Sequence, residues 1–359
     1  MLRIISGFIP AYPHPTQVVA VSGTGFTASE AVDVYIDTTD TLLLVSSATG
    51  TLTGSVTLPA SALPGAHYVT AIGRRSGDAA QAAFTVTTPW AELGFGAAHR
   101  GWNPYENTVG VGNVASFGEL WSAGAYSNGT MPAISQKKVV VATTAGVAEF
   151  STSTGTQIWS SLTSNAFYGS PAISGTSVYI ASINAAALYT LSLTTGATLH
   201  TTTLGSGAYS SPVVANGIVY FGSQDTNVYA FTAREAGLVW KFKLPSIPGG
   251  AIVANGVLYI TSRDGALYAL NAAYGTEIAT FCAGYSFLGT PAISDGVLYL
   301  STEGGRTYAY GLLADVNAAH APVIPPSLSI LHPDMRLTVS PNLAPSDKGP
   351  NLNITDDAE

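Results

Sequence analysis

The ten residues 211–220, SPVVANGIVY, decide the fold of this chain because the sequence repeats them at a regular spacing. Three further copies also end in tyrosine, at residues 170–179, 250–259 and 290–299. The final tyrosines of the four copies lie 41, 39 and 40 residues apart. A degenerate first copy begins at Met131 and has Val140 at the tyrosine position. A period of about 40 residues predicts a β-propeller, in which each repeat forms one blade.

Each copy contains the same succession of turns and strands. In three copies the first short strand ends in an Asn-Gly or Asp-Gly pair, which adopts the positive φ angles that tight hairpins need: Asn216-Gly217, Asn255-Gly256 and Asp295-Gly296. The tyrosine is followed by a polar turn, a strand such as residues 228–231, a glycine turn and a last strand such as residues 238–242. Four short strands per repeat are the pattern of a blade, and we expect the recurring tyrosine to pack one blade against the next.

Five blades are predicted, beginning near residues 131, 170, 211, 250 and 290, and a six-bladed ring that uses the tail is the alternative. The last copy contains only about three strands before the repeat pattern ends at Gly311. Residues 119–123, ELWSA, have the pattern of an outer strand. We therefore expect this segment to pair with the final blade, because closing the ring removes open sheet edges.

Three other regions flank the predicted propeller of residues 117–313. Residues 1–88 contain about seven strand candidates separated by turns, which predicts a two-sheet sandwich. Residues 89–116 form a linker rich in aromatic residues, which we expect to pack against a neighbouring domain. Residues 314–359 are rich in proline, which favours an extended tail. The predicted fold class is all-β throughout.

The composition excludes several classes of partner. Only 9% of residues are charged, the formal net charge is −8, and 13 Lys and Arg residues cannot form the basic stripe that binds nucleic acid. The lone cysteine, Cys282, can form neither an intramolecular disulfide nor a zinc site. No segment approaches the roughly 20 apolar residues needed to cross a bilayer. The scarcity of charge favours an extracellular or cell-surface location, although no export signal is visible and a cytoplasmic location is the alternative.

Two parts of the chain resemble known families. Residues 23–26, GTGF, and residues 63–67, LPGAH, are similar to bacterial immunoglobulin-like domains, which implies that residues 1–88 act as a spacer or adhesion module. The repeats, together with residues 154–159, TGTQIW, and the lead-in residues 95–107, FGAAHRGWNPYEN, resemble the pyrroloquinoline-quinone-like propeller repeat.

The resemblance to the quinone proteins implies a fold but not a cofactor. Quinone-dependent alcohol dehydrogenases of this superfamily have eight blades, a calcium or lanthanide site, a catalytic aspartate and usually a disulfide between adjacent cysteines. This chain departs from them in its smaller number of blades and its single cysteine. Its acidic residues stand mostly at turn positions, where hairpin chemistry explains them: Asp225, Asp264, Asp295 and Glu303. We therefore expect no cofactor, no metal site and no catalytic residue.

The favoured function is that of a non-catalytic structural or interaction protein, an assembly subunit whose propeller is a platform on a spacer domain. Its partner would be another protein or a second copy, bound through the C-terminal tail. The alternative is a module that binds a glycan or small ligand through aromatic residues at the blade entrances, namely Tyr168, Tyr209, Tyr285 and Phe287. A quinone-dependent oxidoreductase is the third and least favoured reading.

Overall fold

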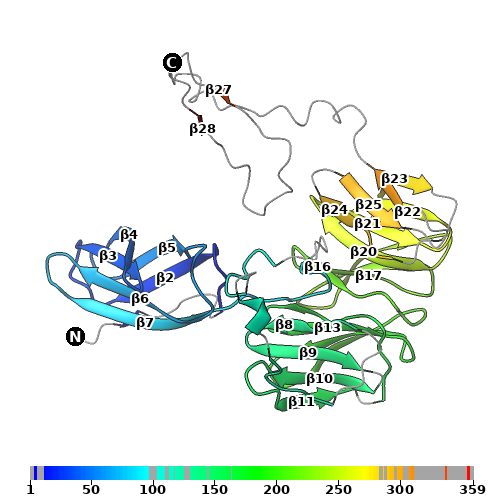
Figure 1. Ribbon diagram of the computed structural model, residues 1–359, viewed down its shortest axis with the longest axis horizontal. Helices are drawn as coiled ribbons and strands as arrows, with labels where there is room; N and C mark the ends of the chain where they lie inside the picture. The colour runs from blue at the N-terminus through cyan, green and yellow to red at the C-terminus, as the bar shows by residue number, and fades with distance from the viewer. Residues whose placement is uncertain are drawn as a thin grey trace. The chain divides into compact units, whose positions relative to one another are not determined.

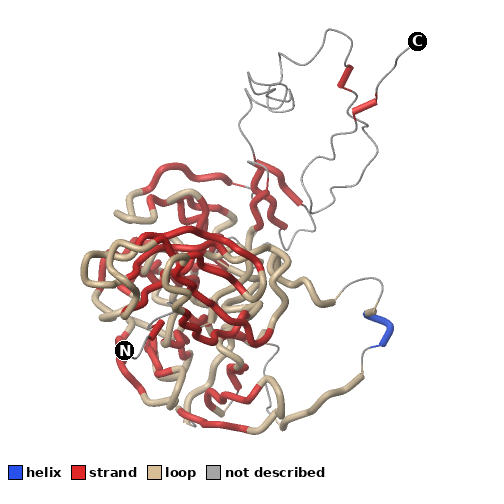
Figure 2. The backbone as a smooth tube through the Cα atoms, turned by 90° about the vertical axis from the view of Figure 1, so that its left-hand side faces the viewer, coloured by secondary structure: helices blue, strands red, loops and turns tan. Residues whose placement is uncertain are grey.

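The computed structural model describes most of the chain before residue 311. The described residues are 4–5, 12–96, 103–109, 113–116, 118–124, 130–143, 145–162, 164–282, 286, 289–294, 297–301, 307–310, 336–337 and 354–355. Residues Met1–Tyr310 form one compact unit and Gly311–Glu359 form a second. Strands dominate the described backbone, and its helical structure is confined to the 3₁₀ turn η1 (Val114–Ser116), drawn in blue in Figure 2. The prediction of an all-β fold is confirmed.

The first seven strands form two antiparallel sheets, coloured blue to cyan in Figure 1. One sheet has the strand order β1–β2–β5 and the other β4–β3–β6–β7. In β3, Val32, Val34 and Ile36 are buried and alternate with partly exposed residues, and they join apolar residues of the other sheet in one core. The strands are β1 (Ile4–Ile5), β2 (Val18–Thr24), β3 (Ala31–Ile36), β4 (Thr39–Val45), β5 (Leu52–Thr57), β6 (Gly65–Gly73) and β7 (Ala79–Val86).

Five antiparallel sheets follow, one for each sequence repeat, and run from green to orange in Figure 1. Within the described residues, the first four are four-stranded, with consecutive strands adjacent, and the fifth is three-stranded. The first and second blades contain β8 (Ala133–Ser135), β9 (Lys138–Thr143), β10 (Gly146–Ser151), β11 (Gln157–Ser161), β12 (Ala172–Ser174), β13 (Ser177–Ser182), β14 (Ala187–Ser192) and β15 (Thr198–Thr203). The other three contain β16 (Val213–Ala215), β17 (Ile218–Gly222), β18 (Asn227–Thr232), β19 (Leu238–Lys243), β20 (Pro248–Ala254), β21 (Val257–Ser262), β22 (Ala266–Asn271), β23 (Glu277–Cys282), β24 (Ala292–Ser294), β25 (Val297–Ser301) and β26 (Thr307–Tyr310).

The first strand of each blade is the innermost one, because β12 contacts both β8 and β16, and β16 contacts β20. The hairpins that join first and second strands have the predicted turn chemistry. Asn216 and Gly217 have φ angles of 50° and 74°, and Asn255 and Gly256 have φ angles of 51° and 78°. Such consecutive positive φ angles match the twist of the flanking strands, so these short hairpins fix the register of each blade.

The recurring tyrosine packs one blade against the next, as predicted. Tyr179 of the second blade is buried, and its hydroxyl donates to the carbonyl oxygen of Ala233 in the third blade at 2.8 Å. Tyr220 of the third blade donates in the same way to the carbonyl oxygen of Ala272 in the fourth blade, at 3.0 Å. Four apolar clusters fill the spaces between successive blades.

The first blade, which has Val140 in place of the tyrosine, uses a buried ion pair at its joint with the second blade. Lys138 Nζ lies 2.6 Å from Glu149 Oε1 and also donates to the carbonyl oxygen of Leu193 in the second blade, at 3.2 Å. Trp159 Nε1 donates to Glu149 Oε2 at 2.8 Å. Burial raises the pKa of Glu149, and the bonds from Lys138 and Trp159 oppose that rise. The Lys138 ammonium group thus donates to the Leu193 carbonyl oxygen in place of the tyrosine hydroxyl that the first blade lacks.

The predicted pairing of residues 119–123 with the final blade is not present in the described part of the chain. Residues 118–124 have no regular secondary structure, and β26 forms the edge of its three-stranded sheet. Trp121 binds the first blade instead, and its Nε1 donates to the carbonyl oxygen of Thr152 at 2.9 Å. The indole covers Gly155, a turn glycine with a φ angle of 66°, because only a residue without a side chain leaves room for it there.

No helix within the described ranges is both long enough and apolar enough to span a membrane. In the second unit, β27 (Arg336–Leu337) and β28 (Ile354–Thr355) pair in antiparallel register. The rest of the predicted Pro-rich tail lies outside the described residues.

Candidate functional site

The blades have two faces, and different sets of loops lie on each. One carries the hairpins between first and second strands, such as residues 135–138 and 215–218, and we call it the hairpin face. The other carries the segments that lead into the first strands, such as residues 164–171 and 204–212, and we call it the tyrosine face. The antiparallel order of strands in every blade places these two sets of loops at opposite ends of the sheets.

Tyr168 and Tyr209 form an exposed aromatic pair on the tyrosine face. Their side chains are 48% and 47% exposed, and their ring centroids lie 5.4 Å apart in an edge-to-face arrangement. The structure therefore brings together two of the four residues proposed from the sequence as ligand contacts. The other two, Tyr285 and Phe287, lie outside the described residues.

The backbone beneath this pair is held by bonds between adjacent blades. The amide of Met131 donates to Ser170 Oγ, and the amide of Ser170 donates to Ser211 Oγ, both at 2.8 Å. A Cβ added at Gly169 would lie 2.7 Å from the carbonyl oxygen of Ser210, so the two loops are in close contact. The backbone that carries the aromatic pair is thus held by hydrogen bonds and a close contact between adjacent blades.

Two acidic residues of the tyrosine face are engaged within the protein, whereas Asp295 and Glu303 lie outside the described residues. Asp225 Oδ2 accepts bonds from the Tyr229 hydroxyl at 2.6 Å and from the Gly205 amide at 3.0 Å. Burial and the Asp225 carboxylate raise the pKa of Tyr229 to about 12. The Tyr268 hydroxyl donates to Asp264 Oδ2 at 2.8 Å in the same arrangement one blade later. These carboxylates support turns, as the turn positions of Asp225 and Asp264 predicted.

Linker residues 90–92 lie across the inner edges of three blades. The amide of Ile134 donates to the carbonyl oxygen of Trp90 at 2.6 Å, and the amide of Ile173 donates to that of Ala91 at 2.7 Å. The next inner strand uses a side chain as its acceptor, since the amide of Val214 donates to Glu92 Oε2 at 2.9 Å. The expected packing of the linker aromatics against neighbouring structure is seen where the ring of Tyr105 stacks on that of His14, with centroids 3.9 Å apart.

Glu92 is a carboxyl group at this inner edge whose pKa is well above its ordinary value. Its side chain is buried, with 5% of the residue exposed, and burial raises its pKa to about 7, while the bond from the Val214 amide acts in the opposite direction. Glu92 therefore changes its charge near neutral pH, at the point where the linker meets the third blade.

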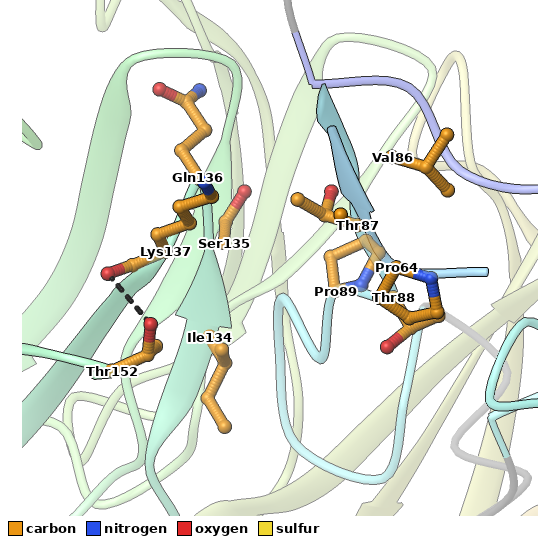
Figure 3. Close-up of a pocket in the computed structure, with 11 residues that line it drawn as sticks. Pro64, Val86, Thr87, Thr88, Pro89, Ile134, Ser135, Gln136, Lys137 and Thr152 are labelled. Atoms are coloured by element: carbon orange, nitrogen blue, oxygen red, sulfur yellow. Dashed lines mark hydrogen bonds between the residues drawn. The ribbon is translucent and has the colours of Figure 1, made fainter. Parts of the chain in front are cut away.

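A cavity of about 330 Å³ lies where the sandwich and the linker meet the first blade (Figure 3). Prolines from both parts line it, and Lys137 lies on the opposite side, where the Thr152 hydroxyl donates to its carbonyl oxygen at 3.2 Å. Lys137 is the one ionisable residue among the lining residues. The cavity thus offers no acid–base pair for catalysis.

The propeller region matches a known family. The family model described as outer membrane protein assembly factor BamB matches residues 106–240 and 224–318, which together cover more than half of the chain. The chain belongs to this family. No protein of curated description matches the BamB-family chain in sequence.

Solved structures similar to the BamB-family chain have low sequence identity to it. BamB from Moraxella catarrhalis is 18% identical, with a TM-score of 0.48, over 54% of this chain and 60% of that one. Quinohemoprotein alcohol dehydrogenase from Comamonas testosteroni is 12% identical, with a TM-score of 0.50, over 63% of this chain and 49% of the enzyme. The computationally designed Ika4 protein is 12% identical, with a TM-score of 0.38, over 41% of this chain and 92% of the design. The chain thus spans less than two thirds of BamB and about half of the dehydrogenase, and the latter likeness shows the fold alone.

The described residues of the BamB-family chain do not fit a calcium–quinone site. A hard cation needs several oxygen ligands that converge on one point. No group of three or more His, Cys, Asp or Glu side chains that could hold a metal ion occurs in the described ranges. The amides of three inner strands are already bonded to residues 90–92. Asp225 and Asp264 are bonded to tyrosine hydroxyls instead of facing a common centre.

Sequence reasoning missed Glu92, because a single acidic residue in an irregular linker has no pattern that marks it as buried. It identified Trp121 but not the surface that Trp121 covers. A signal for that surface is present in the repeats, since Gly155 aligns with Gly196 and Gly275, and Trp159 and Trp240 cover those two glycines.

Proposed function

We propose that this BamB-family chain is a non-catalytic interaction protein of the bacterial cell envelope or cell surface, whose propeller is a rigid platform for a protein partner. The observation that carries the proposal is the exposed pair of Tyr168 and Tyr209 on a backbone held by inter-blade bonds. Tyrosine is enriched at protein interfaces because it buries a large area and loses little side-chain entropy. The description of the family as an assembly factor supports the same function.

We further propose a division of labour along the chain. Residues 1–88 would be an immunoglobulin-like spacer, residues 89–116 the linker, residues 117–313 the platform and residues 314–359 a tail for association. The two packed sheets of the first segment and the hydrogen bonds of residues 90–92 to the blades support the first two assignments. The scarcity of charged residues supports an extracellular or surface location.

Site-specific photo-crosslinking tests the protein partner. A benzoylphenylalanine at position 168 of the full chain, expressed in the producing cell, is expected to form a discrete protein adduct. A matched probe at Tyr274, which is 76% exposed on the hairpin face, is expected to form none. The adduct at position 168 should be lost when Tyr209 is replaced by serine. Equal adducts at both probe positions, or none at position 168, would contradict the proposal.

A glycan or small-ligand module is the second candidate, and the edge-to-face geometry of the tyrosine pair favours it. Each ring of such a pair uses only one side in the contact, so a ring face is available to stack on a sugar or another flat ligand. Screening the full chain on a glycan array should then give a hit whose affinity falls about tenfold in Tyr168→Ala and in Tyr209→Ala. An array without hits would eliminate this candidate.

Quinone-dependent oxidoreduction, the third candidate, has a direct test. The full chain is mixed with pyrroloquinoline quinone and calcium, and its absorption spectrum and dye reduction are followed. We expect no change, because the described residues do not fit the site. A spectral shift together with dye reduction would replace the interaction proposal by an enzymatic one.

A further inference from the structure

Hydrogen bonds from one blade to a backbone carbonyl oxygen of the next blade join the two. The residue that carries this oxygen directly follows the third strand of the later blade, and we call the contact a joint. In the fourth blade this oxygen is that of Ala272. It accepts bonds from the Tyr220 hydroxyl at 3.0 Å and from Trp240 Nε1 at 2.9 Å, both in the third blade. The Trp240 ring covers Gly275, where an added Cβ would lie 2.5 Å from a ring atom. A complete joint therefore uses a tyrosine from a second strand and a tryptophan from a fourth strand.

The first blade contains half of such a joint on the side that faces away from the second blade. Its joint oxygen, that of Thr152, accepts a bond from Trp121 Nε1 at 2.9 Å. Trp121 covers Gly155 as closely as Trp240 covers Gly275, with an added Cβ again 2.5 Å from the ring. Trp121 thus occupies the position of a fourth-strand tryptophan of a preceding blade.

Within the described residues, the neighbour of Trp121 lacks the cover that the same position has in the blades. Leu120 is 91% exposed, whereas the corresponding aliphatic residues on the four outer strands are only about half exposed. These residues and their exposed fractions are Ile158 50%, Leu199 50%, Val239 42% and Ile278 57%. An outer strand shields its aliphatic residue by pairing with a third strand, and residues 118–124 have no such pairing in the described chain.

The fifth blade carries the other half of the joint. Tyr299 has the position of Tyr179 and Tyr220 in its repeat, but it is 45% exposed whereas those residues are 3% and 2% exposed. The blade also has three strands where the other four have four. Among the described residues, it therefore provides a second-strand tyrosine that no following blade covers and a third strand, β26, at the edge of its sheet.

We infer that the fifth blade of one molecule docks on the first blade of a second copy of this chain. Tyr299 of the first molecule donates to the Thr152 oxygen of the second copy. Residues 118–124 of the second copy, held by their own Trp121, add to β26 as the missing fourth strand. The joint then has the same two donors and the same covered glycine as the joint between the third and fourth blades.

A second copy fits this surface better than the first blade of the same chain. Addition of a second copy repeats an existing joint and leaves the others unaltered, as in other repeat proteins. Among the described residues, no apolar cluster joins the fifth blade to the first. Such a contact is head-to-tail, so it builds closed rings or filaments.

Two variants that each damage one half of the joint test the inference. In Tyr299→Ser the fifth-blade face is altered, and in Trp121→Ala the first-blade face is altered. Size-exclusion chromatography with light scattering on the full chain should show association of the wild type that rises with concentration. Each variant alone should dissociate at least about tenfold more readily. An equimolar mixture of the two should form heterodimers, because it contains one intact joint per pair. Tyr274→Ser, which alters an exposed tyrosine outside the joint, should associate like the wild type.

The mixture also separates loss of the joint from loss of folding, since an unfolded variant could not restore association. A short bismaleimide applied to Ala123→Cys/Thr307→Cys in a Cys282→Ser background identifies the occupant, because these two exposed positions lie on the strands to be joined and leave Trp121 and Tyr299 intact. A dimer-sized product supports the second copy. An internally linked monomer would show that the ring closes within one chain and would overturn the inference, as would a wild type that is monomeric at every concentration. The inference concerns the ends of the blade array, so it stands or falls separately from the function proposed for the tyrosine face.

Discussion

Replacing Glu92 with glutamine should remove a pH dependence that this carboxyl group imposes on stability. Burial raises the pKa of Glu92 from its ordinary value of 4.5 to about 7 in the folded protein. Between these two values the folded protein binds more protons than the unfolded chain, so the free energy of unfolding falls as pH rises. One pKa unit corresponds to about 1.4 kcal/mol, so the group lowers stability by roughly 3 kcal/mol between about pH 4.5 and pH 7.

Urea unfolding of the wild type and of Glu92→Gln between about pH 5 and pH 8 measures this effect. We expect similar stability near pH 5 and a more stable variant near pH 8, with a difference approaching roughly 3 kcal/mol. Glutamine has about the same size and retains an oxygen that accepts the bond from the Val214 amide. Glu235→Gln makes the same chemical change at an exposed turn and should leave the pH profile unchanged. Parallel profiles for the wild type and Glu92→Gln would refute the reasoning.

Three further changes test individual parts of the fold. Glu149→Ala leaves the partly buried Lys138 ammonium without its counter-charge and should lower the free energy of unfolding by about 2–3 kcal/mol in urea titrations. A loss below about 1 kcal/mol would contradict the account of the pair. Gly196→Ala should cost about 2–4 kcal/mol in the same assay, because its φ angle is 68° and a Cβ would meet an indole ring at 2.5 Å. Gly217→Ala, with a φ angle of 74° and no atom within 4 Å of an added Cβ, should cost only about 1 kcal/mol, and equal losses would show that the clash is relieved. Burial lowers the pKa of the His67 imidazole, but its hydrogen bonds outweigh burial and raise the pKa overall. His67→Ala should therefore lower the free energy of unfolding by about 1 kcal/mol near pH 5 and progressively less above about pH 7. Thermal melts across this pH range measure the effect, and a loss that does not change with pH would contradict it.

The fold could be predicted where local chemistry and periodicity agree. Asn216 and Gly217 define a hairpin by their own conformational preferences, and the recurrence of the motif defines the blades. The interblade position of Tyr179 and Tyr220 also follows from the repeat, because an apolar ring at the same place in each blade must meet the neighbouring blade.

The parts that could not be predicted depend on contacts between distant segments. Val140 shows that the first blade lacks a tyrosine hydroxyl, but only the folded structure shows that Lys138 reaches the same carbonyl in its place. The attachment of residues 90–92 to three inner strands has no local signal, since one residue contacts each blade. The pairing expected for residues 119–123 failed because the pattern of an outer strand does not specify which sheet provides its partner.

In the candidate site, the sequence predicts where Tyr168 and Tyr209 lie but not whether their rings are exposed. Their spacing of one repeat places them on adjacent blades, and their rings are in contact. Whether a side chain at a blade entrance is covered depends on the loops around it, which differ between repeats. The exposure of the pair is therefore a result of the structure.

The attachment of residues 90–92 determines how mechanical tension would enter the propeller. A pull on the sandwich reaches the inner strands β8, β12 and β16 through these three residues. The load is divided among the amides of Ile134, Ile173 and Val214, so these bonds are strained together and do not open one after another. A propeller tethered in this way would receive a load on the sandwich at three inner strands together.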